Sequence, residues 1–117
     1  LEAVGLLSAI DLMPAELSGG MKKRIALART LILRPRIILY DEPTSGLDPV
    51  TSREISRLIR DIQRRYGAAA IVITHDLACA RLATDRIVLL HDGVAYAQGS
   101  FDELNGMEDP VVKSFFS

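Results

Sequence analysis

The sequence predicts an α/β fold in which a mainly parallel sheet is flanked by helices and followed by a hairpin. Two short apolar runs, Ile37–Tyr40 and Ala69–Thr74, are typical of buried strands, and an amphipathic helical stretch lies between them. An uninterrupted apolar strand indicates a parallel sheet with both faces covered. Further along, Asp92-Gly93 separates two more strand-like runs, which predicts a hairpin.

The composition indicates one globular unit or part of a larger one. The 117 residues are 49% hydrophobic and 25% charged, and the formal net charge is −1. Because no broad basic field exists, nucleic acid is not an expected partner. Cys79 is the single cysteine, which excludes an internal disulfide and suits a reducing compartment. The longest stretch without Asp, Glu, Lys or Arg, 66–75, is too short to span a membrane.

The first residues suggest that the sequence begins inside a protein. There is no initiator Met, and Leu1–Ile10 has the pattern of the middle or end of a helix. Asp11–Glu16 contains Pro14 and is expected to be a loop. We therefore expect residues upstream of Leu1.

A possible anion site follows at Ser18-Gly19-Gly20. Ser18 suits a helix N-cap, and apolar residues at helical spacing predict a helix over Lys22–Leu33. The glycines let a ligand approach the backbone, and the free N–H groups of a helix start favour phosphate. The alternative is an ordinary capped helix after a flexible loop. Taken alone, a motif as short as this one favours that alternative.

Two carboxylates end the first buried strand. Ligands of open α/β sheets collect outside the carboxyl ends of the strands, so Asp41 and Glu42 stand where a ligand would bind. Neighbouring strand residues point to opposite sides, so the two acids can act separately. Asp41 suits Mg²⁺, and Glu42 suits an attacking water. The alternative is a solvated acidic turn.

The next helix and strand bring a histidine to the same edge. Asp48-Pro49 suits a helix start and Gly67 its end, with an apolar stripe between them. The strand after it ends at His75, which can donate to a phosphate or orient a neighbouring carboxylate. A histidine in this position is more often structural. Asp76 is expected to cap the short helix that follows.

The remaining residues predict smaller elements. Strands are expected at 86–91 and 94–98, with His91 beside the turn in a structural role. Ser100 and Glu103 form a capping-box pattern at a helix start, and a last helix should begin at Asp109-Pro110.

Taken together, these motifs resemble those of ABC-type ATPases, a P-loop NTPase family. Leu17–Met21 is similar to the signature motif, and Ile37–Glu42 is similar to the Walker B strand with its catalytic glutamate. Ser45–Asp48 resembles the D-loop, and His75 resembles the switch histidine. Four motifs in this order are specific, and the resemblance covers essentially the whole chain.

The resemblance implies a role for each matching residue. In such ATPases, Asp41 would hold Mg²⁺ through water, Glu42 would polarise the attacking water and His75 would contact the γ-phosphate of ATP. The residues that would contact nucleotide or sense it across a head-to-tail dimer with a second ATPase subunit are Ser18, Gly19, Gly20, Met21 and Asp48.

One departure from the family pattern limits these expectations. The sequence contains neither the Gly-rich phosphate loop that ends in Gly-Lys-Ser/Thr nor the upstream glutamine loop. The chain is therefore expected to be the carboxyl-terminal half of the ATPase domain. Its signature-bearing helical part would be 1–34, and 35–117 would run from Walker B to the end. Alone, it is expected to bind ATP poorly, to be inactive and to be marginally stable.

The resemblance also suggests a transport system. Pro14-Ala15-Glu16, Lys22-Lys23-Arg24 and the tail from Asp109 to Phe116 resemble ATPases that energise phospholipid or other lipid transport with MCE-type substrate-binding proteins. Import of amino acids or other small solutes is the alternative. In both cases the ATPase would be cytoplasmic and peripheral on the inner membrane, bound to a transmembrane permease.

Two other classes of protein compete with this interpretation. One is an SMC-type or DNA-repair ATPase, against which the Pro43–Gly46 link, the near-neutral charge and the hairpin argue. The other is a non-catalytic half-domain that only binds a partner. The presence of Glu42 and His75 argues against it.

Overall fold

The computed structural model describes residues 19–116, which fall into two compact units. The amino-terminal unit extends to Ala83 and the carboxyl-terminal unit starts at Thr84. Ser18, the expected helix cap, lies outside the described residues. Within 19–116, none of the helices is both long and apolar enough to cross a membrane.

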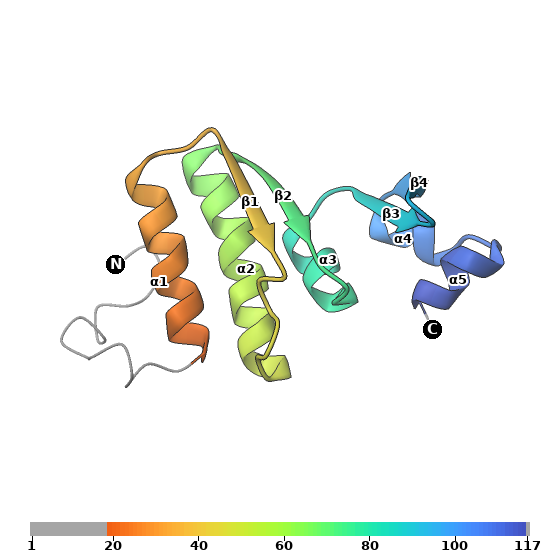
Figure 1. The fold of residues 1–117 in the computed structure, drawn as a ribbon, viewed down its shortest axis with the longest axis horizontal. Helices are drawn as coiled ribbons and strands as arrows, with labels where there is room; N and C mark the ends of the chain where they lie inside the picture. The colour runs from red at the N-terminus through yellow and green to blue at the C-terminus, as the bar shows by residue number, and fades with distance from the viewer. Residues whose placement is uncertain (1–18, 117) are drawn as a thin grey trace. The chain divides into compact units, whose positions relative to one another are not determined.

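The amino-terminal unit alternates helices and strands (Figure 1). Its elements in chain order are α1 (Gly19–Ile32), β1 (Ile37–Asp41), α2 (Pro49–Tyr66), β2 (Ala69–Ile73) and α3 (Leu77–Ala83). The strands β1 and β2 form a two-stranded parallel sheet, in register from Ile37 beside Ala69 to Asp41 beside Ile73. The parallel pairing, and the helix that crosses between the strands, are as predicted.

The helix α2 begins and ends at the residues that the sequence indicates. Asp48 is its N-cap and accepts a hydrogen bond from the Thr51 N–H at 3.1 Å, with Pro49 at the first helical position. Gly67 ends it with φ 69°, in the left-handed region that favours glycine. Between the caps, Ile55, Ile59 and Ile62 are all buried.

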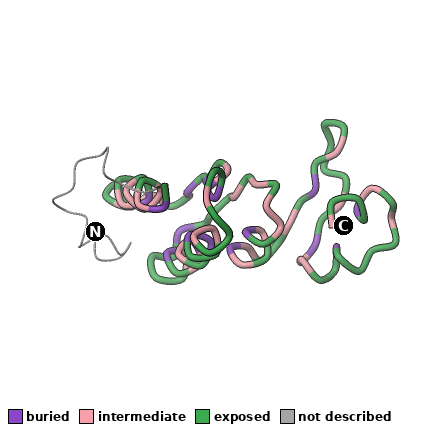
Figure 2. The backbone as a smooth tube through the Cα atoms, turned by 90° about the horizontal axis from the view of Figure 1, so that it is seen from below, coloured by how far each residue is buried: buried purple, intermediate pink, exposed green. Residues whose placement is uncertain are grey.

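One core holds the amino-terminal unit together (Figure 2). Its fully or nearly buried members come from four elements and the turn before β2, namely Leu27, Ile38, Tyr40, Ile55, Ile59, Ile62, Ala68, Cys79 and Ala83. Cys79 therefore packs in the core, as expected, and burial raises the pKa of its thiol.

The prediction that both faces of the parallel sheet are covered is wrong for the described residues. Burial alternates along β1, with Ile38 and Tyr40 inside while Leu39 is 71% exposed. On β2, Ile71 stands beside Leu39 on the same outer face and is 55% exposed. The reason is that the helices α1, α2 and α3 share one core with the inner face, and no other described element of this unit packs on the outer one.

The carboxyl-terminal unit is a hairpin with two short helices. The strands β3 (Ile87–His91) and β4 (Val94–Gly99) pair antiparallel, and α4 (Phe101–Asn105) and α5 (Pro110–Phe116) follow. The capping box at the start of α4 forms as predicted, because the Ser100 hydroxyl accepts from the Glu103 N–H and the Glu103 carboxylate accepts from the Ser100 N–H. Phe116 packs back on this unit's core and edge-on to Phe101.

Candidate functional site

The carboxyl ends of β1 and β2 bring the predicted site residues to one edge. Asp41 pairs with Ile73 at the last position of the sheet, and the Glu42 N–H donates to the Ile73 carbonyl at 2.7 Å. This bond extends the pairing one residue beyond the sheet. The chain segments that carry Glu42 and His75 therefore leave the sheet side by side.

The Glu42 backbone adopts an uncommon conformation. Its φ is 49°, in the left-handed region that residues other than glycine rarely adopt. Three hydrogen bonds hold it there, because Glu42 donates to Ile73 and its carbonyl accepts from the Ser45 N–H at 3.2 Å and from Lys23 Nζ at 3.4 Å. Such strained residues are common at functional sites.

Glu42 and His75 form a direct contact. His75 Nδ1 lies 2.9 Å from Glu42 Oε1, and the His75 side chain is 86% exposed. The hydrogen bond that His75 makes to the Glu42 carboxylate raises the pKa of His75, and the charges of Glu42 and Asp76 act in the same direction. With Nδ1 occupied by Glu42, the other ring nitrogen of His75 is the one available to a ligand. The second oxygen of Glu42 can accept a hydrogen bond from water.

Asp41 offers a carboxylate that suits a hydrated metal ion. It is exposed at the strand end, and within residues 19–116 its side chain makes no hydrogen bond or ion pair. Within residues 19–116, no group of three or more His, Cys, Asp or Glu side chains is arranged so that it could hold a metal ion. A single free carboxylate fits Mg²⁺, which keeps most of its waters and takes few protein ligands. It does not fit an ion that needs a complete protein cage.

The glycines of the signature-like motif lie at the start of α1. Gly19 is exposed, Gly20 is buried, and Met21 is half-buried against the core. A methyl group added to Gly19 would stand 3.0 Å from Leu47 Cδ2, so the helix start lies close to the turn before Asp48. Within 19–116, no hydrogen bond joins these glycines to Glu42 or His75, so the predicted residues form two separate groups.

Asp48 has the structural role that the sequence predicts for it, as the N-cap of α2. Besides capping α2, its carboxylate accepts from Thr51 Oγ1 at 2.6 Å, and this hydrogen bond lowers the pKa of Asp48. The side chain is exposed at the end of the Ser45–Asp48 turn. It therefore remains accessible to another protein surface.

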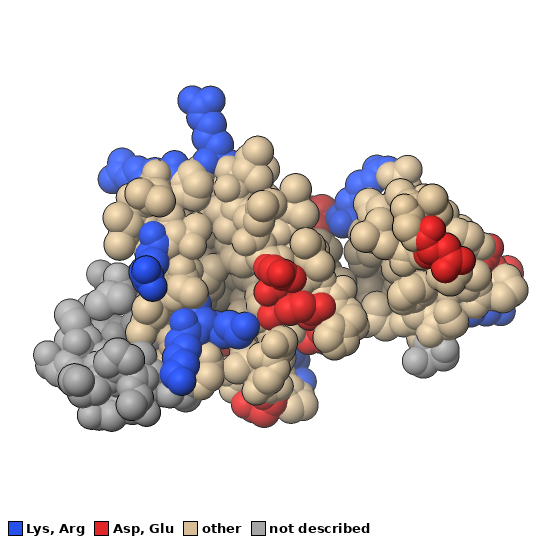
Figure 3. All heavy atoms as spheres, viewed as in Figure 1, with Lys and Arg blue, Asp and Glu red and all other residues tan. Residues whose placement is uncertain are grey.

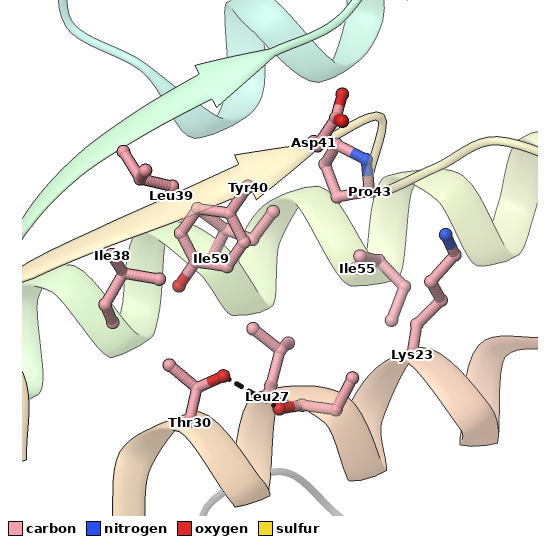
Figure 4. Close-up of a pocket in the computed structure, with 11 residues that line it drawn as sticks. Lys23, Leu27, Thr30, Ile38, Leu39, Tyr40, Asp41, Pro43, Ile55 and Ile59 are labelled. Carbon is pink, nitrogen blue, oxygen red and sulfur yellow. Dashed lines mark hydrogen bonds between the residues drawn. The ribbon is translucent and has the colours of Figure 1, made fainter. Parts of the chain in front are cut away.

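Two residues near the site were not singled out by sequence reasoning. Thr44 is buried in the turn after β1, and its hydroxyl donates to Asp76 Oδ2 at 2.9 Å. Lys23 extends from α1 toward the turn that contains Pro43 (Figure 4). Neither could be found from local signals, since a threonine in a turn or a lysine on a helix gives no sign of its distant partner.

A hollow of about 190 Å³ lies between α1 and β1, over α2. Its wall is mostly apolar, with Lys23 and Asp41 at the end near the site. Figure 3 shows a group of acidic side chains beside a mostly uncharged surface on the same unit. On the same face Lys and Arg side chains stand at several separate places, so charge is not confined to one end of the strands.

Comparison with known proteins defines the class. A family model described as "ABC transporter" matches residues 1–45. The solved ADP conformation of MJ1267, an ATP-binding cassette of an ABC transporter, is 28% identical over 99% of this chain and 46% of that one, with a TM-score of 0.85. The dimeric post-hydrolysis structure of the cassette MJ0796, bound to ADP and Pi, is 39% identical over 75% of this chain and 38% of that one, with a TM-score of 0.63. The chain belongs to the ABC transporter ATP-binding family.

Curated relatives come from more than one transport system. The methionine import ATP-binding protein MetN 2 of Rhodopseudomonas palustris is 42% identical over the whole chain, which covers 31% of the relative. The intermembrane phospholipid transport system ATP-binding protein MlaF of Escherichia coli K12 is 42% identical over 98% of the chain, which covers 43% of the relative. The chain thus spans less than half the length of each.

Proposed function

We propose that the protein is the ATP-hydrolysing motor subunit of an ABC transporter. The observation that carries the proposal is the 2.9 Å contact between Glu42 and His75 beside the exposed Asp41, at the carboxyl ends of two parallel strands. This arrangement places a base, an orienting group and a metal-binding carboxylate at one edge. Phosphoryl transfer from ATP to water needs these three functions.

The geometry supports a separate role for each of the three residues. His75 contacts one oxygen of Glu42 and thereby fixes the orientation of the carboxylate. The second oxygen of Glu42 then orients the attacking water. The free ring nitrogen of His75 donates to the γ-phosphate. Asp41 binds Mg²⁺ through water, and the ion would supply charge neutralisation at the phosphates.

The second group of residues acts across a dimer. Ser18, Gly19 and Gly20 would contact the γ-phosphate of ATP held by a second ATPase subunit in a head-to-tail arrangement. Met21 would belong to the same nucleotide-binding motif, and Asp48 would sense the nucleotide across the interface. The exposed Gly19 at the start of a fourteen-residue helix supports this, because a helix start favours anions. The dimeric structure of the related cassette MJ0796 with ADP and Pi also supports it.

The transported substrate is proposed to be a lipid or phospholipid. Similarity to MlaF and the motif resemblances support this, and an MCE-type protein would then deliver the substrate to the permease. Methionine or another amino acid is the alternative, supported by an equal 42% identity to MetN 2. In either system the subunit would lie at the cytoplasmic side of the inner membrane, bound to the transmembrane permease.

The chain by itself is proposed to be inactive. It represents one part of an ATPase domain, with 1–34 carrying the signature region and 35–117 the hydrolytic edge. The phosphate loop that would hold the nucleotide is missing from its sequence. ATP binding to the isolated chain should therefore be weak compared with binding to the natural full-length protein.

The test is ATP hydrolysis by the full-length protein and its Glu42→Gln variant. We expect the variant to lose at least about 100-fold in kcat while still binding ATP, since general-base catalysis contributes roughly 10²–10⁴-fold. Arg57→Ala, on the exposed face of α2, is the matched control and should keep its activity. Equal hydrolysis by the wild type and Glu42→Gln would reject the assignment. Stimulation of the reconstituted transporter by phospholipid or by methionine distinguishes the two substrates.

A further inference from the structure

The Glu42–His75 contact cannot fix its own geometry. His75 is 86% exposed, and exposed ion pairs contribute little because water screens them and two side chains must be ordered. Glu42 also sits on a backbone with φ 49°, which the chain adopts only where its surroundings hold it. The bond from the Glu42 N–H to the Ile73 carbonyl joins the two segments where they leave the sheet, and a second tie beyond it would fix the side chains more closely.

A partly buried hydrogen bond joins the same two segments one step further along. Thr44 is two residues after Glu42, and Asp76 is one residue after His75. The Thr44 hydroxyl donates to Asp76 Oδ2 at 2.9 Å, and Thr44 is only 6% exposed. A hydrogen bond to a charged acceptor away from water is stronger than one in solvent.

Asp76 is itself firmly held. Its other oxygen, Oδ1, accepts from the N–H groups of Ala78 and Cys79 at 3.0 and 3.3 Å, at the start of α3. Its own N–H donates to Thr74 Oγ1 at 3.0 Å. Because Cys79 is fully buried in the core, Asp76, the acceptor of the Thr44 hydrogen bond, is anchored to the interior.

We propose that Thr44 and Asp76 are positioning residues, whose hydrogen bond keeps Glu42 within reach of His75. The bond ties the turn after β1 to the turn after β2, and so fixes the carboxylate relative to the imidazole. For its catalytic consequence this inference rests on the proposed ATP hydrolysis. The positioning itself is a property of the protein without nucleotide.

A simpler interpretation is that Thr44 only satisfies a buried hydroxyl. In that case its removal would weaken the fold as any buried hydroxyl would, and leave the Glu42–His75 contact intact. Ser56 provides the comparison, because it is 1% exposed and its hydroxyl donates to the Ser52 carbonyl at 2.8 Å within α2. That bond lies within α2 and does not join the turn that carries Glu42, although the Ser56 and Thr44 hydroxyls both contact the Cys79 thiol.

The experiment compares Thr44→Val, Thr44→Ser and Ser56→Ala in the natural full-length protein. Valine keeps the branched shape without the hydroxyl, and serine keeps the hydroxyl. Thr44→Ala is a second variant without the hydroxyl, to be used if Thr44→Val does not fold. The first readout is the ring ¹⁵N signal of His75 at fixed pH without nucleotide, with Glu42→Ala as the reference for a lost contact. The second readout is the kinetics of ATP hydrolysis, in which kcat and KM for ATP are determined separately for each variant.

We expect Thr44→Val to move the His75 signal toward the Glu42→Ala position. Its kcat should fall about 10- to 100-fold with KM within about twofold, as expected for a displaced catalytic group. Thr44→Ser and Ser56→Ala should match the wild type. The proposal is overturned if Thr44→Val leaves the signal or the kcat unchanged, or if Ser56→Ala changes them equally. If the wild type does not hydrolyse ATP, the proposed function fails, and the His75 signal alone decides the positioning.

Discussion

Removing the side chain of Ile62 should test the packing of α2. Ile62 is 2% exposed in a core shared with β1 and α3. Ile62→Ala deletes three carbons, worth about 0.8 kcal/mol each in transfer free energy. The space left behind adds a cavity term, so the expected loss is about 3–4 kcal/mol of unfolding free energy. Ile62→Val removes one carbon and should cost about 1 kcal/mol.

Equilibrium urea unfolding of the full-length protein measures these differences. The expectation holds in the longer protein, because further chain can bury Ile62 more but cannot expose it while α2 packs as described. Arg57→Ala lies on the exposed face of the same helix and should change stability by less than about 0.5 kcal/mol. A loss below about 1 kcal/mol for Ile62→Ala would refute the packing of α2 described above.

Three further predictions concern caps and charge. Gly67→Ala adds a methyl group that meets nothing within 4 Å, yet φ 69° should still make it cost about 1 kcal/mol in urea unfolding. Gly67→Asn should cost less, because asparagine tolerates this region. Ser100→Ala removes the cap of α4 and should cost about 1 kcal/mol, measured in the same way; no change would mean that the capping box does not form. The pKa of His75 is raised above its usual 6.5 by its contact with Glu42. The stability that this contact contributes is therefore fully present below pH 6.5. That stability should be lost as pH rises through the raised pKa, and urea unfolding against pH should show a weaker loss for Glu42→Gln.

The local elements of this protein are determined by short-range sequence signals. Asp48, Pro49 and Gly67 mark the two ends of α2, and the structure places its caps there. Ser100 and Glu103 likewise give a capping box. These signals work because each cap bonds to backbone within three or four residues, so the interaction is complete in the local sequence. The two parallel strands are also determined by local signals, because each is one continuous apolar run and the helix that connects them lies between them in the sequence.

Which polar groups meet was decided by the tertiary structure. Sequence order placed Glu42 and His75 at one edge, but the two residues are 33 positions apart and only the strand register brings them to 2.9 Å. The bond from Thr44 to Asp76 spans 32 positions and gave no sequence signal at all. The left-handed backbone of Glu42 is equally non-local, because its N–H is held by the neighbouring strand.

The sheet shows the same division between local and tertiary information. The uninterrupted apolar run Ile37–Tyr40 indicated burial on both sides, yet Leu39 and Ile71 are exposed together on the outer face. The sequence by itself determined that this segment is an apolar parallel strand ending in two acids. Only the packing of α1, α2 and α3 in one shared core decided which face is buried, because burial depends on what lies opposite a side chain and not on the side chain alone.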